Sequence, residues 1–323
     1  MRNLDTILRR LVPSVAALSH CRWLMAPLDW IDRLLSSPFR EARRLPPNRF
    51  RIRVGVGNRV LFNQFHHLLL PINFWFHVFS RGYASFDSQI LDIGCGCGRF
   101  AMPLRDYDLY DSRFTGRYTG LDLDREMIDW CRRHFDQRFD FVCLNHYSRV
   151  YNPTGERGAP VIFPVEDDSQ DFVFAISLLT HLLPSDLEQY LRETWRVLKP
   201  GAVMTMSVFC IDFLDERLRQ RWSFPYRQGA AYLQSQRYPE AAVAYEKRYL
   251  LDVCSSIGYG GVQLRPGPGQ ALLVAKKPVS ARAAFLAGPA EPTQSEIDSD
   301  FWSEEQRATP LRSPAAPAAL DTD

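Results

Sequence analysis

The 323-residue sequence lacks several features that would have pointed to particular classes of protein. No apolar run approaches the roughly 20 residues that span a bilayer, so no transmembrane segment is expected. The seven cysteines include no C-x-x-C pair, which excludes the usual spacing of a zinc site or a redox dithiol. An odd number of thiols, scattered through apolar runs, is typical of reduced cysteines in a cytoplasmic protein.

Charge is unevenly distributed along the chain. Residues 1–60 hold twelve arginines, no lysine and four acids, whereas residues 291–323 hold eight acids and two arginines. The basic head and the acidic tail could contact each other or another molecule, but charge runs are most often solvated surface. The apolar stretch 11–18 is interrupted by Pro13 and Ser14, and no clean small-residue cleavage site follows it, so a helix is expected and not a secretory signal. A helix lying on a membrane surface is the alternative, giving weak membrane contact through the N-terminal region.

Composition divides the chain into three parts. Residues 1–87 are rich in arginine and aromatic residues and predict an N-terminal helical extension. Residues 88–278 alternate short apolar runs with helical patterns and predict the main domain. Residues 279–323 are rich in alanine, proline, serine and acids, and predict a disordered acidic tail.

Alternating strands and helices in the middle region predict an α/β fold. The expected strands are 90–93, 118–123, 140–144, 171–176 and 202–209, followed by a closing pair at 261–264 and 270–275. Asp124 suits the N-cap of one helix, and a Ser185–Glu188 capping box with Pro184 before it predicts the start of another. Such βαβ units form a mainly parallel sheet that binds ligands at the carboxyl ends of its strands.

The segment 90–100, ILDIGCGCGRF, is the most informative motif. Its glycines allow a sharp turn and close approach of the backbone to a ligand. The dinucleotide pattern G-x-G-x-x-G fails, because Arg99 stands where the third glycine belongs. The remaining pattern, Asp-x-Gly-x-Gly-x-Gly, resembles the class I S-adenosylmethionine-dependent methyltransferase family. The resemblance implies that Asp92, Gly94, Cys95, Gly96 and Gly98 hold the methionine end of S-adenosyl-L-methionine.

Three further stretches resemble the same family in the same order. Asp122, after the second strand, would accept both ribose hydroxyls, and Leu123 would lie against adenine. Asn145, after the third strand, would meet the adenine amino group, although it could equally form a turn. Ser177 follows the fourth strand, beside the expected sulfonium. The resemblance covers residues 88–278 and implies a Rossmann-like, seven-stranded, mainly parallel sheet with helices on both faces.

Alternatives stay open for several of these residues. Asp92 could cap the following helix instead of binding a ligand, and Cys95 favours packing over metal binding, so no metal site is expected. His181 is the candidate base for an acceptor hydroxyl, or a structural histidine. The insertion 211–245 is aromatic and basic, and predicts either a lid or acceptor wall or one or two amphipathic helices. The aromatic run 74–79 favours core over a substrate wall.

The predicted reaction is methyl transfer to an oxygen or nitrogen atom of a small-molecule or sugar-containing (glycan) acceptor. No nucleic-acid-binding module is recognisable, and no Asn-Pro-Pro-Tyr type of motif follows the fourth strand, so no nucleic-acid partner is expected. Two rival functions remain. One is a non-catalytic, methyltransferase-like binding protein, and the other is an NAD-dependent oxidoreductase.

Overall fold

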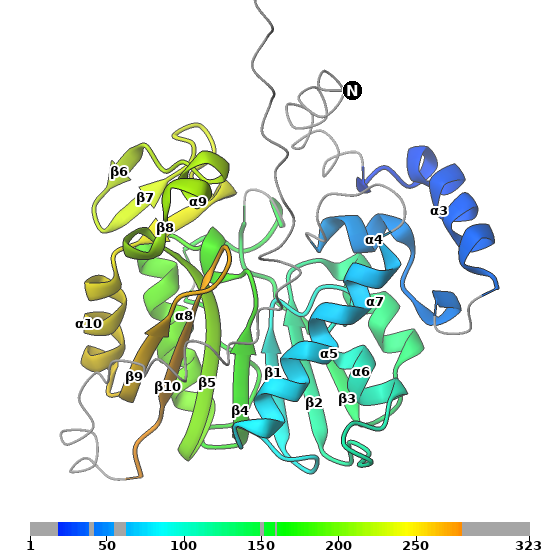
Figure 1. Cartoon of the computed structure of the whole chain (residues 1–323), viewed down its shortest axis with the longest axis horizontal. Helices are drawn as coiled ribbons and strands as arrows, with labels where there is room; N and C mark the ends of the chain where they lie inside the picture. The colour runs from blue at the N-terminus through cyan, green and yellow to red at the C-terminus, as the bar shows by residue number, and fades with distance from the viewer. Residues whose placement is uncertain (1–18, 39–41, 55–62, 149–151, 159, 280–323) are drawn as a thin grey trace, which may run out of the picture.

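The computed structural model describes residues 19–38, 42–54, 63–148, 152–158 and 160–279 (Figure 1). Its central sheet is formed by β1 (Gln89–Ile93), β2 (Arg117–Asp122), β3 (Phe139–Cys143), β4 (Gln170–Ala175), β5 (Leu198–Cys210), β9 (Gly260–Arg265) and β10 (Ala271–Lys276). The strands lie in the order β3-β2-β1-β4-β5-β10-β9. The first five are parallel, and β10 runs antiparallel to both β5 and β9. The predicted seven-stranded, mainly parallel sheet is confirmed.

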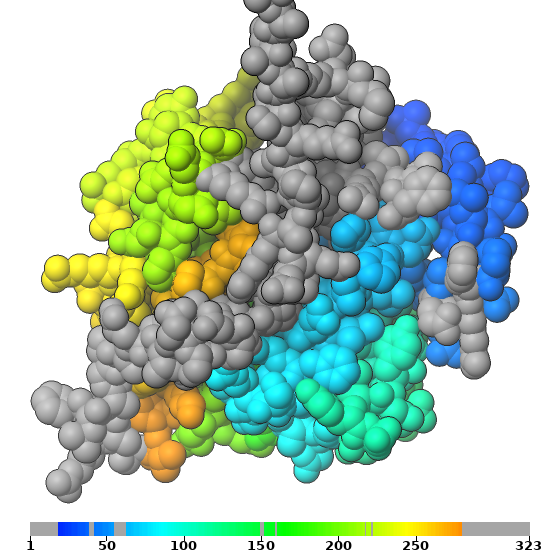
Figure 2. Space-filling view, in the orientation of Figure 1, coloured from blue at the N-terminus to red at the C-terminus, as the bar shows by residue number. Residues whose placement is uncertain are grey.

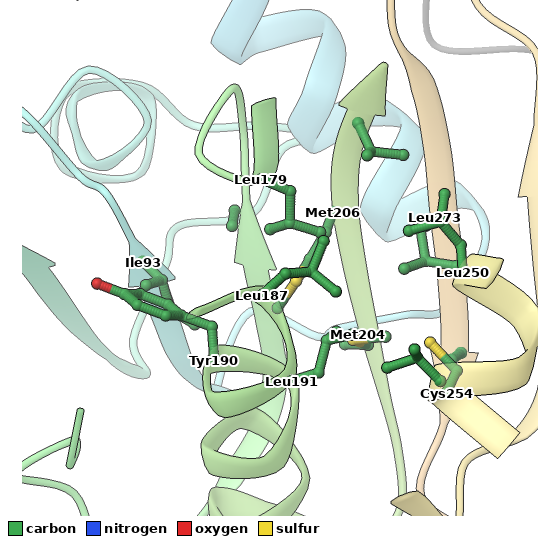
Figure 3. Packing of buried hydrophobic residues seen from close by; sticks show 14 of the residues in the cluster. Ile93, Leu179, Leu187, Tyr190, Leu191, Met204, Met206, Leu250, Cys254 and Leu273 are labelled. Atoms are coloured by element: carbon green, nitrogen blue, oxygen red, sulfur yellow. The ribbon is translucent and has the colours of Figure 1, made fainter. Parts of the chain in front are cut away.

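Helices cover both faces of this sheet. One face carries α5 (Gln64–Ser80), α6 (Ala101–Asp106) and α7 (Arg125–His134), and the other carries α8 (Pro184–Val197) and α10 (Lys247–Ile257). Figure 3 shows the apolar core between the sheet and the helices α8 and α10. There Leu187 and Leu191 of α8 pack with Met204 and Met206 of β5. On the first face Phe74 and Trp75 are 1% and 0% exposed, which confirms the core interpretation of 74–79 for these two rings.

Of the two predicted helix starts, the structure confirms the one at Asp124 and not the one at Ser185. Asp124 caps α7 as expected, accepting from the backbone N–H groups of Glu126 and Met127. The Ser185–Glu188 capping box is wrong, because α8 begins one residue earlier at Pro184 and has no side-chain cap. Proline suits the first helical position, since its fixed φ matches the helix and its missing N–H would have had no partner there.

The N-terminal helices are held to the domain by buried arginines. They comprise α3 (Arg22–Ser36), η1 (Ala42–Arg44) and α4 (Asn48–Arg53). The expectation of a solvated basic surface is wrong for Arg49, Arg51 and Arg53, whose side chains are 14%, 1% and 5% exposed. Their partners are carboxylates of α3 and of the start of α7: Asp29, Asp32, Asp124 and Glu126.

The insertion 211–245 contains three short strands as well as short helical turns. It contains η3 (Ile211–Phe213), α9 (Glu216–Arg221), β6 (Tyr226–Gln228), β7 (Ala231–Leu233), η4 (Pro239–Ala241) and β8 (Val243–Tyr245). The expectation of one or two amphipathic helices packed on the sheet is therefore wrong, apart from the six-residue α9. At 13 residues β5 extends beyond its neighbours, and β8 pairs with its last two residues, which leaves less strand edge unpaired.

Several predictions fall on residues that the structure does not describe. The 11–18 helix and the acidic tail from residue 280 onward are among them. Within the described ranges, no helix is both long and apolar enough to cross a bilayer.

Candidate functional site

The glycine turn joins β1 to α6 at the carboxyl edge of the sheet. Gly94, Gly96 and Gly98 have φ of +81°, +54° and +72°, a left-handed conformation that other residues adopt only with strain. The backbone N–H groups of Gly94 and Cys95 donate to the Leu121 carbonyl, at 2.8 and 3.0 Å. The turn is therefore fixed against the end of β2, where the second predicted motif lies.

Asp122 is the residue that joins these two motifs. Its Oδ2 accepts from the Gly96 N–H at 2.7 Å, and its Oδ1 accepts from the Asp124 N–H at 2.8 Å. Burial raises the pKa of this carboxyl, while the two backbone N–H groups oppose the shift by favouring the charged form. A carboxylate offers about four acceptor positions, so about two stay open for the hydroxyls of a ribose.

Asp92 lies beneath the turn and not on an open surface. It is 1% exposed and accepts a hydrogen bond from the Tyr118 hydroxyl on β2. Burial raises its pKa to about 8, and the nearby charge of Asp122 acts in the same direction. It does not cap α6, whose N-cap is Phe100 with no side-chain bond, so that alternative is wrong. The predicted contact with the amino end of methionine stays a prediction.

The thiol of Cys95 is buried and packs against β2. Cys95 is 3% exposed, and a Cβ added to Gly120 would lie 2.8 Å from its Sγ. Gly120 on β2 thus leaves room for this thiol. Among the described residues, no group of three or more histidine, cysteine or acidic side chains is placed to hold a metal ion.

The remaining predicted cofactor residues follow β2, β3 and β4 at the same sheet edge. Leu123 is half-buried and Asn145 is exposed, with its carbonyl accepting from the Glu156 N–H at 2.8 Å. Ser177 is exposed at φ +60°, and its N–H donates to Ser207 Oγ at 2.6 Å. A Cβ on Gly94 would lie 3.5 Å from Leu178, so the segment after β4 borders the glycine turn.

Sequence reasoning missed a polar cluster beside Ser177. Ser207 Oγ on β5 donates to Gln270 Oε1 at 2.6 Å, and Gln270 Nε2 donates to Ser177 Oγ at 3.1 Å. Gln270 immediately precedes β10, so three strands contribute to this cluster. Sequence reasoning also missed Tyr118. In the β1–β2 register Tyr118 lies opposite Ile90, and Ile90 and Asp92 are two residues apart on one strand, so all three share a face of the sheet.

The central part of the chain matches a known protein family. Residues 91–206 match the family model described as a methyltransferase domain. Residues 91–206 therefore belong to a methyltransferase domain.

Curated relatives resemble this chain over the same region. A sterol 24-C-methyltransferase of Schizosaccharomyces pombe is 33% identical over 122 residues, which are 36% of this chain and 26% of that protein. A malonyl-[acyl-carrier protein] O-methyltransferase of Salmonella typhimurium is 29% identical over 135 residues, 42% of this chain and 44% of that protein. The chain therefore spans less than half the length of either relative. A methyltransferase structure from Methanosarcina mazei aligns at 20% identity with a TM-score of 0.45, over 62% of this chain and 98% of that one.

His181, the predicted base, contacts the insertion of the methyltransferase domain. Its Nδ1 donates to the Glu240 carbonyl at 2.9 Å, because a carbonyl can only accept. Burial lowers the pKa of the ring, and the backbone groups of Glu240 and Ala241 partly oppose this shift. The lowered pKa favours the neutral imidazole, which is the form a base needs, but one ring nitrogen is bonded to the insertion. This geometry supports the structural alternative.

The N-terminal helices cover the glycine turn of the methyltransferase domain. A Cβ added to Gly96 would lie only 2.6 Å from Val54 Cγ1, so the Val54 side chain lies directly against Gly96. Arg53 donates to Asp124 at 2.9 Å and to Glu126 at 3.0 Å, which fixes α4 on the first turn of α7. The extension and the glycine turn are consequently one packed unit.

A cavity of about 250 Å³ lies in the insertion, beside the end of β5. Ile211, Leu214, Trp222 and Phe224 give it an apolar lining, and Arg219 adds a positive charge. It is separate from the glycine turn in sequence and in lining.

Proposed function

We propose that this chain transfers the methyl group of S-adenosylmethionine to an oxygen or nitrogen atom of a small-molecule or sugar-containing acceptor. The observation that carries the proposal is the hydrogen bond from the Gly96 N–H to Asp122. It brings the turn after β1 and the acid after β2 into one site. An acid at this position suits a ribose in either cofactor class, so the glycine spacing makes the distinction: Arg99 stands where the dinucleotide pattern has its third glycine.

Each predicted residue has a defined task in this proposal. Bound S-adenosylmethionine would supply an already activated methyl group, so the protein mainly aligns the nucleophile and excludes water. Asp122 would hold the ribose hydroxyls, Leu123 and Asn145 the adenine, and Ser177 would border the sulfonium. The methionine end would contact the turn formed by Asp92, Gly94, Cys95, Gly96 and Gly98. As the new bond to the acceptor forms, the carbon–sulfur bond breaks, and the acceptor releases one proton.

The surroundings of the site support a small acceptor. We propose that residues 1–87 cover the cofactor, as the Val54–Gly96 contact suggests, and that 211–245 forms a wall for the acceptor. The related proteins vary: two are named for sterol and malonyl-acyl carrier acceptors, and one of Gallus gallus, 25% identical, is named a tRNA N(3)-cytidine methyltransferase. Here Arg49, Arg51 and Arg53 are paired with carboxylates, so they do not offer a free basic surface to RNA.

Calorimetric titration with S-adenosylhomocysteine and with NAD tests the cofactor assignment. We expect S-adenosylhomocysteine to bind with a dissociation constant of about 1–100 μM, and NAD to show no heat of binding. Binding of NAD alone would overturn the proposal in favour of the oxidoreductase. Transfer of label from methyl-tritiated donor to a metabolite extract is then expected. Label in the RNA fraction alone would contradict the small acceptor, and absence of transfer to any fraction would support the non-catalytic alternative.

Two substitutions at His181 separate a base from an anchor. We expect His181→Asn to keep activity within about threefold, because its amide can still donate to the Glu240 carbonyl, whereas His181→Ala loses a hydrogen bond worth about 1 kcal/mol of stability. The measurements are kcat and KM across pH, with thermal unfolding of both variants. If both variants lose about 100-fold or more in kcat and the pH dependence changes, His181 is the base.

A further inference from the structure

Helix α3 has its apolar side turned outward. Six large apolar side chains of this helix are exposed to solvent, at positions that recur with helical spacing. They are Trp23 (89%), Leu24 (59%), Trp30 (66%), Ile31 (37%), Leu34 (57%) and Leu35 (46%). An amphipathic helix on a globular domain normally buries its apolar side. The exposed stripe therefore indicates a binding surface for another protein or a membrane.

The inward side of α3 is polar, and it fixes the orientation of the helix. Asp29 pairs with Arg49 at 2.6 Å, and Asp32 pairs with the buried Arg51 at 2.6 Å. Gln64 of α5 donates to both Asp32 and Ser36, at 2.7 and 2.9 Å. Rotating the helix to bury its tryptophans would expose these partners and leave Arg51 buried without its carboxylate, which is strongly unfavourable.

The charge on the outer side of α3 has one sign. Arg22 and Arg33 are exposed, whereas both acids of the helix face inward toward arginines. The neighbouring Arg43 of η1 is exposed as well. The surface therefore combines tryptophan and leucine with positive charge, the composition that suits the boundary between the headgroups and the acyl chains of an anionic bilayer. Figure 2 shows α3, in blue, along an outer edge of the molecule.

We propose that the exposed face of α3 docks onto an anionic phospholipid bilayer, with Trp23 and Trp30 inserted at its surface. A second copy of the chain fits this face less well, because two copies would bring Arg22 and Arg33 together with no acid on the outer side to pair with them. Bilayer phosphates supply the missing negative charge. The inference is independent of methyl transfer, since none of these side chains contacts the glycine turn.

Vesicle flotation tests the proposal with the full chain. We expect binding to phosphatidylcholine vesicles containing about one third phosphatidylglycerol, weaker binding at high salt, and little binding to phosphatidylcholine alone. The double variant Trp23→Ser/Trp30→Ser should lower the bound fraction at least about tenfold, because the apolar anchors are gone. Arg22→Gln/Arg33→Gln should lower the preference for anionic vesicles.

Matched controls make the outcome decisive. Ile162→Ser removes another exposed apolar side chain, 66% exposed and outside α3, and should float like the unaltered protein. S-adenosylhomocysteine binding reports that each variant is folded. The proposal is overturned if the unaltered protein stays unbound, or if the double tryptophan variant floats equally well. It is also overturned if sedimentation shows a dimer that this variant dissociates, because the occupant is then a second copy.

Discussion

Replacing Asp122 with alanine is expected to weaken the binding of S-adenosylhomocysteine by at least about 100-fold, because hydrogen bonds to a charged acceptor contribute about 1.5–3 kcal/mol each. Two ribose hydroxyls would lose this acceptor together. The Gly96 and Asp124 N–H groups lose it as well, at 2.7 and 2.8 Å, so the glycine turn loses its connection to β2 through this side chain. Isothermal titration calorimetry measures the effect.

Asp140→Ala is the matched control for this variant. Asp140 is an exposed acid on β3, the strand next to β2, and its removal changes the overall charge equally. We expect the control to bind S-adenosylhomocysteine with unchanged affinity. Near-equal affinities for Asp122→Ala and the unaltered protein, with both folded by circular dichroism, would refute the proposed ribose contact.

Arg51→Ala is expected to destabilise the N-terminal helices by about 3–5 kcal/mol, the usual cost of leaving a buried charge without its partner. The Arg51 side chain is 1% exposed and pairs with Asp32 at 2.6 Å, and Asp32 is itself almost buried. Arg51 also donates to Asn63 Oδ1 at 2.7 Å and to the Pro46 carbonyl at 3.0 Å. The variant would leave all three acceptors short of a donor. Urea denaturation followed by tryptophan fluorescence gives the free energy of unfolding.

Two further variants show whether the ion pair is the cause. Arg33→Ala removes an exposed arginine from α3 and should change stability by less than about 0.5 kcal/mol. Arg51→Met/Asp32→Leu removes both charges, and should recover a large part of the loss because no unpaired charge remains. A loss below about 1 kcal/mol in Arg51→Ala would mean that water reaches Asp32 and that the network is not buried in solution.

The local sequence pattern was sufficient to predict the central strands and the residues that meet at the glycine turn. Apolar runs four to eight residues long placed the central strands, although β5 begins at Leu198 and not at 202. The glycine pattern gave the turn, whose three glycines have positive φ. Because parallel strands end at a common edge, the residues following each strand were expected to meet, and Asp122 does contact the turn.

Errors arose where a residue had alternative partners. Ser185 and Glu188 have the spacing of a capping box, but the helix begins at Pro184, so Ser185 lies inside its first turn and not at the N-cap. The insertion has helical stretches in its sequence, but the free edge of β5 pairs with β8 in the folded chain. An adjacent proline decided the first case, and a strand distant in the sequence decided the second.

The sequence alone determined the α/β fold, the glycine turn and the acids after its strands, because these depend on hydrophobic periodicity and on backbone freedom within a few residues. Only the tertiary structure decided that Arg51 pairs with Asp32, that Val54 lies on Gly96, and that His181 holds the Glu240 carbonyl. These partners are 19, 42 and 59 residues apart. A charge or a ring nitrogen can pair with any complementary group that folding brings near it, so its partner is set by the packing of the elements and not by the pattern around it.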